Sequence, residues 1–164
     1  MKNLIDFSSR FRILKGGKIS LVVSGLLLGS SLSADTTIST ATTAQLNETN
    51  LNITITDTGS ITNNTTTNSN ADSAIFISDT GLSSTQFIMN EGDITALSSW
   101  GSGIYLFGVV DDNEGVITNR GNINAGNIGI SLAGDNIGNV INDTDGTINS
   151  FSHAIYICKI TMET

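Results

Sequence analysis

Apolar and polar residues alternate along several short stretches of this chain. In GIYLF (103–107) every second residue is apolar on one face, and GNINA (121–125) places Ile123 between two asparagines. GVITN (115–119) lies between these two stretches. A period of two over four to six residues predicts β-strands with one buried face. Three short strands are therefore expected in this segment.

The same strands recur in units of 25 to 29 residues. The phrase NRGNINA (119–125) has close copies in NEGDITA (90–96) and DGTINS (145–150), and each copy leads to a second phrase, GIYL, GISL or AIYI. The repeated positions are the glycines Gly92, Gly121 and Gly146 and the isoleucines Ile75, Ile104, Ile130 and Ile155. A fixed spacing of this size is typical of solenoid repeats.

Stacking the units in register predicts apolar ladders on three faces. One face holds the four isoleucines above with Ile77, Leu106, Leu132 and Ile157 beside them; the second holds Phe87, Val116 and Val140 with Ile88, Ile117 and Ile141; the third holds Ile94, Ile123 and Ile148, preceded by Ile61. One unit cannot bury its apolar face alone, but stacked units share a continuous core. Glycine, asparagine and aspartate separate the strands, as expected of turns with positive φ angles.

These ladders predict an all-β fold, a right-handed parallel β-helix with about three to four coils. The alternative is a β-sandwich with turns at similar spacing, and the in-register copies favour the solenoid. We expect an N-terminal cap and loop rich in threonine, asparagine and serine at 35–72, solenoid repeats at 73–157, and an aberrant tail at 158–164. The tail loses the repeat phrase after Ile157, which indicates a truncated product; a genuine short end-cap is the alternative.

The first 34 residues have the pattern of a helical signal peptide. A basic segment ends at Lys18, an apolar run follows at 19–29, and the small residues SSLSA precede cleavage between Ala34 and Asp35. The run is shorter than the roughly 20 apolar residues that cross a bilayer. Export is therefore expected, with the export machinery as a partner and no membrane-spanning segment in the mature chain. An uncleaved anchor is the alternative.

The charge distribution limits the partners of the mature chain. The net charge is −8, and five of the seven basic residues lie within the first 18 positions. An acidic surface rich in hydroxyl and amide groups repels phosphate, so nucleic-acid binding is not expected. Hydrophobic residues make up 38% of the chain and aromatic residues 5%, which suits a thin solenoid core.

Candidate chemistry is sparse. His153 is the only histidine and Cys158 the only cysteine, so neither a histidine metal pair nor an activated thiol is expected. The loop DDNEG (111–115), with Asp111, Asp112 and Glu114, has oxygen ligands that suit Ca²⁺, as does DTDG (143–146). A solvated acidic loop is the alternative for both. We expect no catalytic residue, cofactor or metal.

Enzymes built on β-helices need carboxylates or basic groups that converge on one face. Asp93 and Asn122 occupy matching positions on successive units, but no cluster of acids follows along a ladder. After the leader the basic residues are Arg120 and Lys159. A secreted polysaccharide-active enzyme is therefore the third hypothesis rather than the first.

Paired N-x-G-x-I and G-I-x-L phrases resemble the passenger domains of bacterial autotransporters. The leader FRILKGGKISLVVSGLLLGSSLSA (11–34) resembles their extended signal peptides, and the resemblance covers this leader and roughly residues 50–157. It implies a β-helical passenger that reaches the periplasm, the cell surface or the medium, associated with the outer membrane where a C-terminal outer-membrane domain is present. We expect a non-enzymatic, adhesin-like protein that contacts host glycans, host proteins or sister molecules. A non-functional remnant of such a gene is the alternative.

Overall fold

The computed structural model describes residues 35–47, 52–78, 81–107 and 113–158. The expected signal peptide and its last residue, Ala34, lie outside the described residues. Asp111, Asp112 and the tail from Lys159 also lie outside them. Within the described ranges the chain is all β apart from one short 3₁₀ turn, η1 (Asn70–Asp72). These ranges contain no helix that is long and apolar enough to cross a membrane.

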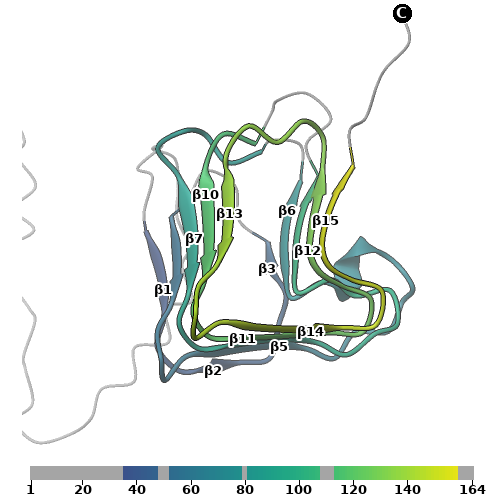
Figure 1. The fold of residues 1–164 in the computed structure, drawn as a ribbon. Helices are drawn as coiled ribbons and strands as arrows, with labels where there is room; N and C mark the ends of the chain where they lie inside the picture. Colours follow the sequence, from purple (N-terminus) through teal and green to yellow (C-terminus); the bar gives the residue numbers. More distant parts are fainter. Residues whose placement is uncertain (1–34, 48–51, 79–80, 108–112, 159–164) are drawn as a thin grey trace, which may run out of the picture. The chain divides into compact units, whose positions relative to one another are not determined.

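The strands form three parallel sheets of five (Figure 1). Sheet A contains β1 (Thr36–Ile38), β4 (Ile53–Ile55), β7 (Phe87–Asn90), β10 (Val116–Asn119) and β13 (Asn139–Asn142). Sheet B contains β2 (Ala41–Thr42), β5 (Ser60–Asn63), β8 (Asp93–Ala96), β11 (Asn122–Ala125) and β14 (Thr147–Ser150). Sheet C contains β3 (Leu46–Asn47), β6 (Ile75–Ser78), β9 (Ile104–Phe107), β12 (Ile128–Ala133) and β15 (His153–Cys158).

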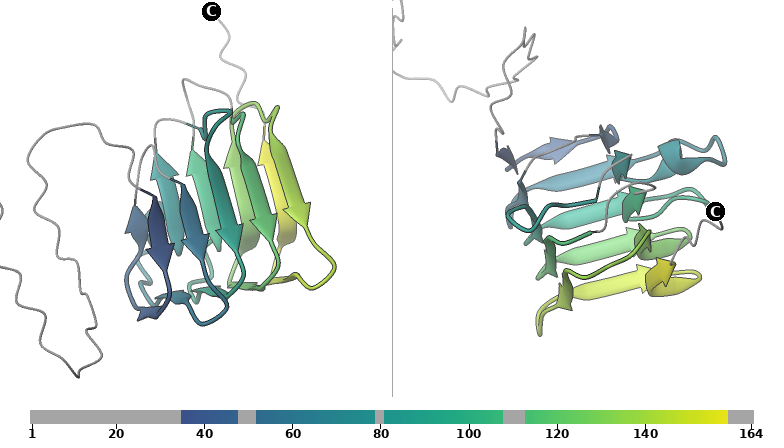
Figure 2. Two further views of the ribbon diagram at one scale, coloured as in Figure 1. Left: turned by 90° about the vertical axis from the view of Figure 1, so that its left-hand side faces the viewer. Right: turned by 90° about the horizontal axis from the view of Figure 1, so that it is seen from above.

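The chain passes from sheet A to sheet B to sheet C and then begins the next coil. All strand pairs are parallel, and four turns separate β1 from β13. The coils lie one beside the next along a single axis (Figure 2), about 4.8 Å apart, the usual spacing of paired strands. The prediction of an all-β parallel solenoid is confirmed.

Inward-facing residues form continuous apolar ladders. Ile75, Ile104, Ile130 and Ile155 pair in sequence along sheet C, with Ile77, Leu106, Leu132 and Ile157 beside them. Ile61, Ile94, Ile123 and Ile148 pair along sheet B. Full burial of one such side chain contributes about 1.5–3 kcal/mol, and the members on the inner coils are buried because coils on both sides cover them.

One predicted register is wrong. Val140 pairs with Ile117, not with Val116, and Ile141 pairs with Thr118. A slip of one residue moves side chains to the opposite face of the sheet, so Val140 lies inward and Ile141 lies outward, 44% exposed. The shared register is set by the asparagine that ends each strand, since Asn119 pairs with Asn142.

Strand pairing extends into the segment expected to form a cap and loop. Residues 36–63 contribute β1 to β5, with Thr36 beside Ile53 and Leu46 beside Ile75. The exposed loop lies further along, at 64–71. The N-terminal strands are only two to four residues long.

The repeated glycines are explained by close packing between coils rather than by positive φ angles. A Cβ atom on Gly92 would lie 2.2 Å from the carbonyl oxygen of Gly59, and one on Gly121 would lie 2.1 Å from that of Gly92. Among the described glycines, positive φ occurs at Gly134. The phrase N-x-G therefore repeats because the backbone of each coil touches the backbone of the previous one.

The last coil exposes part of the apolar core. Ile155 is 39% exposed and Ile157 is 50% exposed, whereas their partners Ile130 and Leu132 are 0% and 2% exposed. The side of β13, β14 and β15 away from the stack has no further strand among the described residues.

Candidate functional site

Charged residues lie at the corners between the sheets. In the described strands the only charged side chain is Asp93, on the outer face of sheet B. The sheet faces therefore differ mainly in their uncharged side chains. Any contact with a partner depends on which of these faces it meets.

A buried asparagine ladder fixes the corner between sheets A and B. The side-chain amide of Asn119 donates to Oδ1 of Asn142 at 2.7 Å and to the carbonyl oxygen of Thr147 at 3.1 Å. Asn90 donates to Oδ1 of Asn119 in the same way. Each of these amides thus bonds both sheet A and sheet B of the neighbouring coil, which makes this corner rigid.

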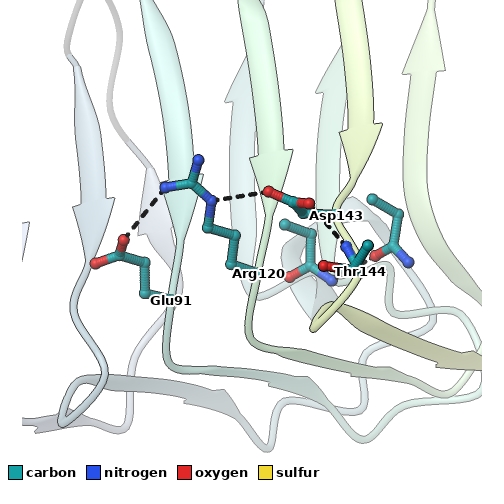
Figure 3. A network of polar contacts seen from close by, with 6 residues as sticks. Glu91, Arg120, Asp143 and Thr144 are labelled. Atoms are coloured by element: carbon teal, nitrogen blue, oxygen red, sulfur yellow. Dashed lines mark hydrogen bonds and ion pairs between the residues drawn. The ribbon is translucent and has the colours of Figure 1, made fainter.

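Outside this ladder, Glu91, Arg120 and Asp143 follow the three asparagines on successive coils (Figure 3). Arg120 lies between the two acids, with Nη1 3.6 Å from Oε1 of Glu91 and Nε 3.1 Å from Oδ2 of Asp143. The backbone amide of Thr144 and then the Arg120 side chain lower the pKa of Asp143 from 3.8. These pairs are exposed to water and screened by salt, so they contribute little to stability.

A buried carboxylate organises the corner between sheets B and C. Asp72 is fully buried. It accepts hydrogen bonds from Oγ of Ser98 at 2.6 Å, from the hydroxyl and backbone amide of Thr67 at 2.7 and 2.8 Å, and from the backbone amide of Asn68 at 2.9 Å. Burial opposes ionisation, but these four donors outweigh it and lower the pKa of Asp72 from 3.8 to about 2. Asp72 therefore holds the 64–71 loop against the next coil.

The outer face of sheet B carries a second, exposed ladder of polar side chains. Asn122 donates to Oδ1 of Asp93 at 2.9 Å and accepts from the hydroxyl of Thr147 at 2.5 Å. In the parallel row, the amide of Asn149 donates to Oδ1 of Asn124 at 3.1 Å. Hydrogen bonds along the solenoid axis thus hold these groups in fixed orientations on three successive coils.

A groove of about 450 Å³ lies beside this ladder and crosses the last three coils. Its polar side is formed by Asn124 and Asn149, while Leu97 and Phe151 are 63% and 91% exposed. The lining residues are Ala96, Leu97, Asn124, Ala125, Gly126, Asn149, Ser150 and Phe151. Exposed apolar side chains that gather beside ordered polar groups are typical of interaction surfaces.

The residues singled out for possible chemistry are separated in the structure. Nδ1 of His153 lies 2.6 Å from Oγ of Ser152, and the His153 ring lies 5.3 Å from that of Tyr156. Cys158 ends β15, in the same strand. Asp93 and Asn122 are adjacent through a hydrogen bond, as their matching positions predicted.

Of the two candidate calcium loops, DDNEG is only partly described and DTDG is described in full. Asn113 uses its side chain to accept from the backbone amide of Leu82 and to donate to Asn136, so it stabilises a corner. The carboxylate of Asp143 accepts hydrogen bonds from Nε of Arg120 and from the backbone amide of Thr144. In the described part of the chain, no group of three histidine, cysteine, aspartate or glutamate side chains is arranged to hold a metal ion.

Comparison with known protein families, with curated proteins and with solved structures finds no match for this chain. The features that carry a functional argument are therefore the ordered polar ladder of sheet B and the groove beside it. The sequence predicted a surface rich in hydroxyl and amide groups, but it did not locate this ladder. The apolar rim formed by Leu97 and Phe151 was not expected, because neither residue lies in a repeated strand position.

Proposed function

We propose that this protein is an exported, non-enzymatic β-solenoid that works by surface contact, as an adhesin-like passenger of the autotransporter type. The observation that carries the proposal is the hydrogen-bonded ladder on the outer face of sheet B, next to the groove between Leu97 and Phe151. The leader at 1–34 supports export, with cleavage after Ala34. A right-handed winding is expected, because crossovers between parallel strands of one sheet are nearly always right-handed.

Fixed ladders suit contact with a large partner. Each hydrogen bond to Asn122, Asn124 or Asn149 is weak by itself, but the groups recur at every coil, about 4.8 Å apart. Their side chains are already held by one another, so binding loses less conformational entropy than it would with free side chains. Many weak bonds then add up along the solenoid.

Charge narrows the class of partner. The chain has 15 acidic and 7 basic residues, and most of the basic ones precede the mature protein. Most of the described acids lie at the corners between the sheets, and Asp93 lies on the face of sheet B. Long-range repulsion therefore disfavours anionic partners, and the proposal is contact with neutral or basic surfaces.

Binding of the fluorescently labelled protein to intact cells and to glycan- or protein-coated beads tests this function. The full-length chain is expressed in a bacterial host and purified as the host processes it. Asn124→Arg places a long side chain on the polar ladder, and we expect binding to fall at least about tenfold. Thr118→Arg, on the outer face of sheet A, is the matched control and is expected to bind normally.

Three results would contradict the proposal. The first is an absence of saturable binding to any of these surfaces, and the second is equal binding by both arginine variants. The third is cleavage of the glycan by the chain, which would favour the polysaccharide-active enzyme. N-terminal sequencing of the purified protein tests the expected cleavage after Ala34.

A further inference from the structure

The aromatic residues of the mature chain are concentrated on the outer face of sheet C. Of seven aromatic residues after position 34, four lie there: Phe76, Tyr105, Phe107 and Tyr156. They are at outward positions because their strand neighbours, such as Ile104 and Leu106, point into the core. We call these four residues the aromatic strip.

The strip follows the solenoid axis. Phe76 pairs with Tyr105, Tyr105 with Ser131 and Ser131 with Tyr156, while Phe107 pairs with Ala133 in the parallel row. The strip lies on β6, β9 and β15, and β12 lies between β9 and β15; β6, β12 and β15 are labelled in Figure 1. Ring centroids are 5.5 Å apart for Phe76 and Tyr105 and 6.0 Å apart for Tyr105 and Phe107. Phe76, Tyr105 and Phe107 are thus packed together before any ligand arrives, while Tyr156 lies beyond Ser131 and packs against the His153 ring.

The strip is uncharged. None of the residues in β3, β6, β9, β12 and β15 is an aspartate, glutamate, lysine or arginine. Phe76, Tyr105 and Phe107 are partly exposed, and Tyr156 is 39% exposed. The strip therefore offers ring surface and two phenolic hydroxyl groups, with repulsive acids only at the surrounding corners.

The area of the strip is too small for a protein interface and suits a linear polymer. Three coil steps from Phe76 to Tyr156 span about 15 Å, and two alternate residues along a strand span about 7 Å. The footprint is on the order of 100 Å², far below the roughly 800 Å² per partner of a stable protein interface. A second copy of this chain or a folded protein would need much more area than the strip supplies, whereas a linear polymer fits its shape.

We propose that the aromatic strip binds an uncharged, linear glycan that runs along the solenoid axis. This goes beyond the proposed function, because it names a ligand class and places a second contact on sheet C, separate from the contact on sheet B. The C–H faces of sugar rings pack on aromatic rings, and the coil spacing of about 4.8 Å is close to the length of one hexose unit in an extended chain. The phenolic groups of Tyr105 and Tyr156 supply hydrogen bonds to sugar hydroxyls.

Calorimetric titration and glycan-array binding of the full-length chain test the proposal. The array holds linear neutral oligosaccharides, including cellohexaose and mannohexaose, and matched acidic ones, including hexagalacturonate. We expect binding to at least one neutral linear glycan and at least about tenfold weaker binding to the acidic ones. An absence of binding to every neutral linear glycan, or a preference for the acidic ones, overturns the proposal.

Substitutions at Tyr105 and Phe87 test whether the glycan binds on the strip. Tyr105→Ala is expected to weaken binding at least about tenfold, while Tyr105→Phe keeps the ring and is expected to lose only a few-fold. Phe87→Ala removes an aromatic ring from the outer face of sheet A, where β7 carries it, and serves as the matched control with unchanged affinity. Equal affinity of Tyr105→Ala and Phe87→Ala, with thermal unfolding showing both folded, overturns the assignment to the strip.

The two proposals fail in different ways. If Tyr105→Ala keeps the parent's affinity for the neutral glycan while Asn124→Arg loses binding to cells, the glycan assignment on sheet C is wrong and the contact function on sheet B stands. If the chain binds a neutral glycan through the strip but no cell or coated bead, the adhesin-like function is wrong and the strip remains a glycan site.

Discussion

The side-chain amide of Asn90 donates a hydrogen bond to the side-chain oxygen of Asn119 at 2.7 Å, and neither residue is exposed to solvent. The side-chain amide of Asn119 in turn donates to the side-chain oxygen of Asn142 and to the carbonyl oxygen of Thr147. Three coils are thus joined by one chain of amides, which is buried at Asn90 and Asn119 and reaches the surface at Asn142. Because buried polar groups must keep their partners, the ladder permits only one register between the coils.

Replacing Asn119 tests this ladder. Asn119→Ala removes the donor to Asn142 and Thr147, and it leaves the buried Asn90 amide with only its longer bond of 3.3 Å to the carbonyl oxygen of Asn122. We expect the free energy of unfolding to fall by about 1–3 kcal/mol for these losses, measured by urea denaturation. Asn124→Ala, in the exposed ladder of sheet B, is the matched control and is expected to change stability by less than about 0.5 kcal/mol. Similar losses in both variants would contradict a special role for the buried ladder.

The parallel solenoid follows from sequence because its periodicities are simple. Alternation within GIYLF and GNINA defines strands, and the in-step repeats of Ile104 and Ile123 define which strands stack. The register of β13 was predicted wrongly because VI occurs in both GVITN and NVIN, and matching these letters misplaces Val140 by one residue. Aligning the terminal asparagines, Asn119 with Asn142, gives the register of the structure.

Other features depend on contacts that the repeats do not encode. The strands between 36 and 47 have few apolar residues, so their pattern is weak, and they are held by pairing with coil two. The burial of Asp72 depends on how the 64–71 loop folds back toward Ser98. The aromatic strip, in contrast, is encoded at the outward positions 76, 105 and 156, which alternate with the predicted core ladder.

A charge in the middle of a ladder is expected to unfold the stack. Ile123 is 0% exposed between Ile94 and Ile148, so Ile123→Asp buries a carboxylate that has no partner. We expect no cooperative unfolding transition in the far-ultraviolet circular dichroism of this variant. Ile148→Asp, on the partly exposed last coil, is the control and is expected to keep the transition at a lower midpoint. If Ile123→Asp melts like the parent, the sheet B ladder is misassigned.

Close approach of the coils makes the repeated glycines intolerant of any side chain. Gly121→Ala would place Cβ 2.1 Å from the carbonyl oxygen of Gly92, and relief of this clash requires the two coils to separate. We expect a loss of more than about 2 kcal/mol in unfolding free energy, comparable to overpacking of a core. Asn122→Ala, at the exposed next position, is expected to be nearly neutral. Equal stability of the two variants in urea denaturation would show that the corner is more open than the structure indicates.

The buried carboxylate of Asp72 predicts an acid-sensitive corner. Burial disfavours its charged form, but the hydrogen bonds from Ser98, Thr67 and Asn68 lower its pKa from 3.8 to about 2. A carboxyl group whose pKa is lower in the folded state stabilises the fold fully above the unfolded pKa and loses that contribution as the pH falls through the folded pKa. Stability from this corner is therefore expected to decline between about pH 4 and pH 2.

Ser98→Ala removes the shortest of these hydrogen bonds, at 2.6 Å, so the folded pKa of Asp72 is expected to rise. The part of the decline that belongs to Asp72 then still begins near the unfolded pKa, but it ends at a higher pH and is smaller, because the difference between the folded and unfolded pKa shrinks. Thermal unfolding midpoints measured from pH 2 to pH 7 follow this change, with Ser83→Ala, an exposed serine, as the control that retains the parent profile. If the Ser98→Ala and Ser83→Ala profiles coincide, then Ser98 does not hold the ionised carboxylate, and the 64–71 loop is fixed to the next coil by other contacts.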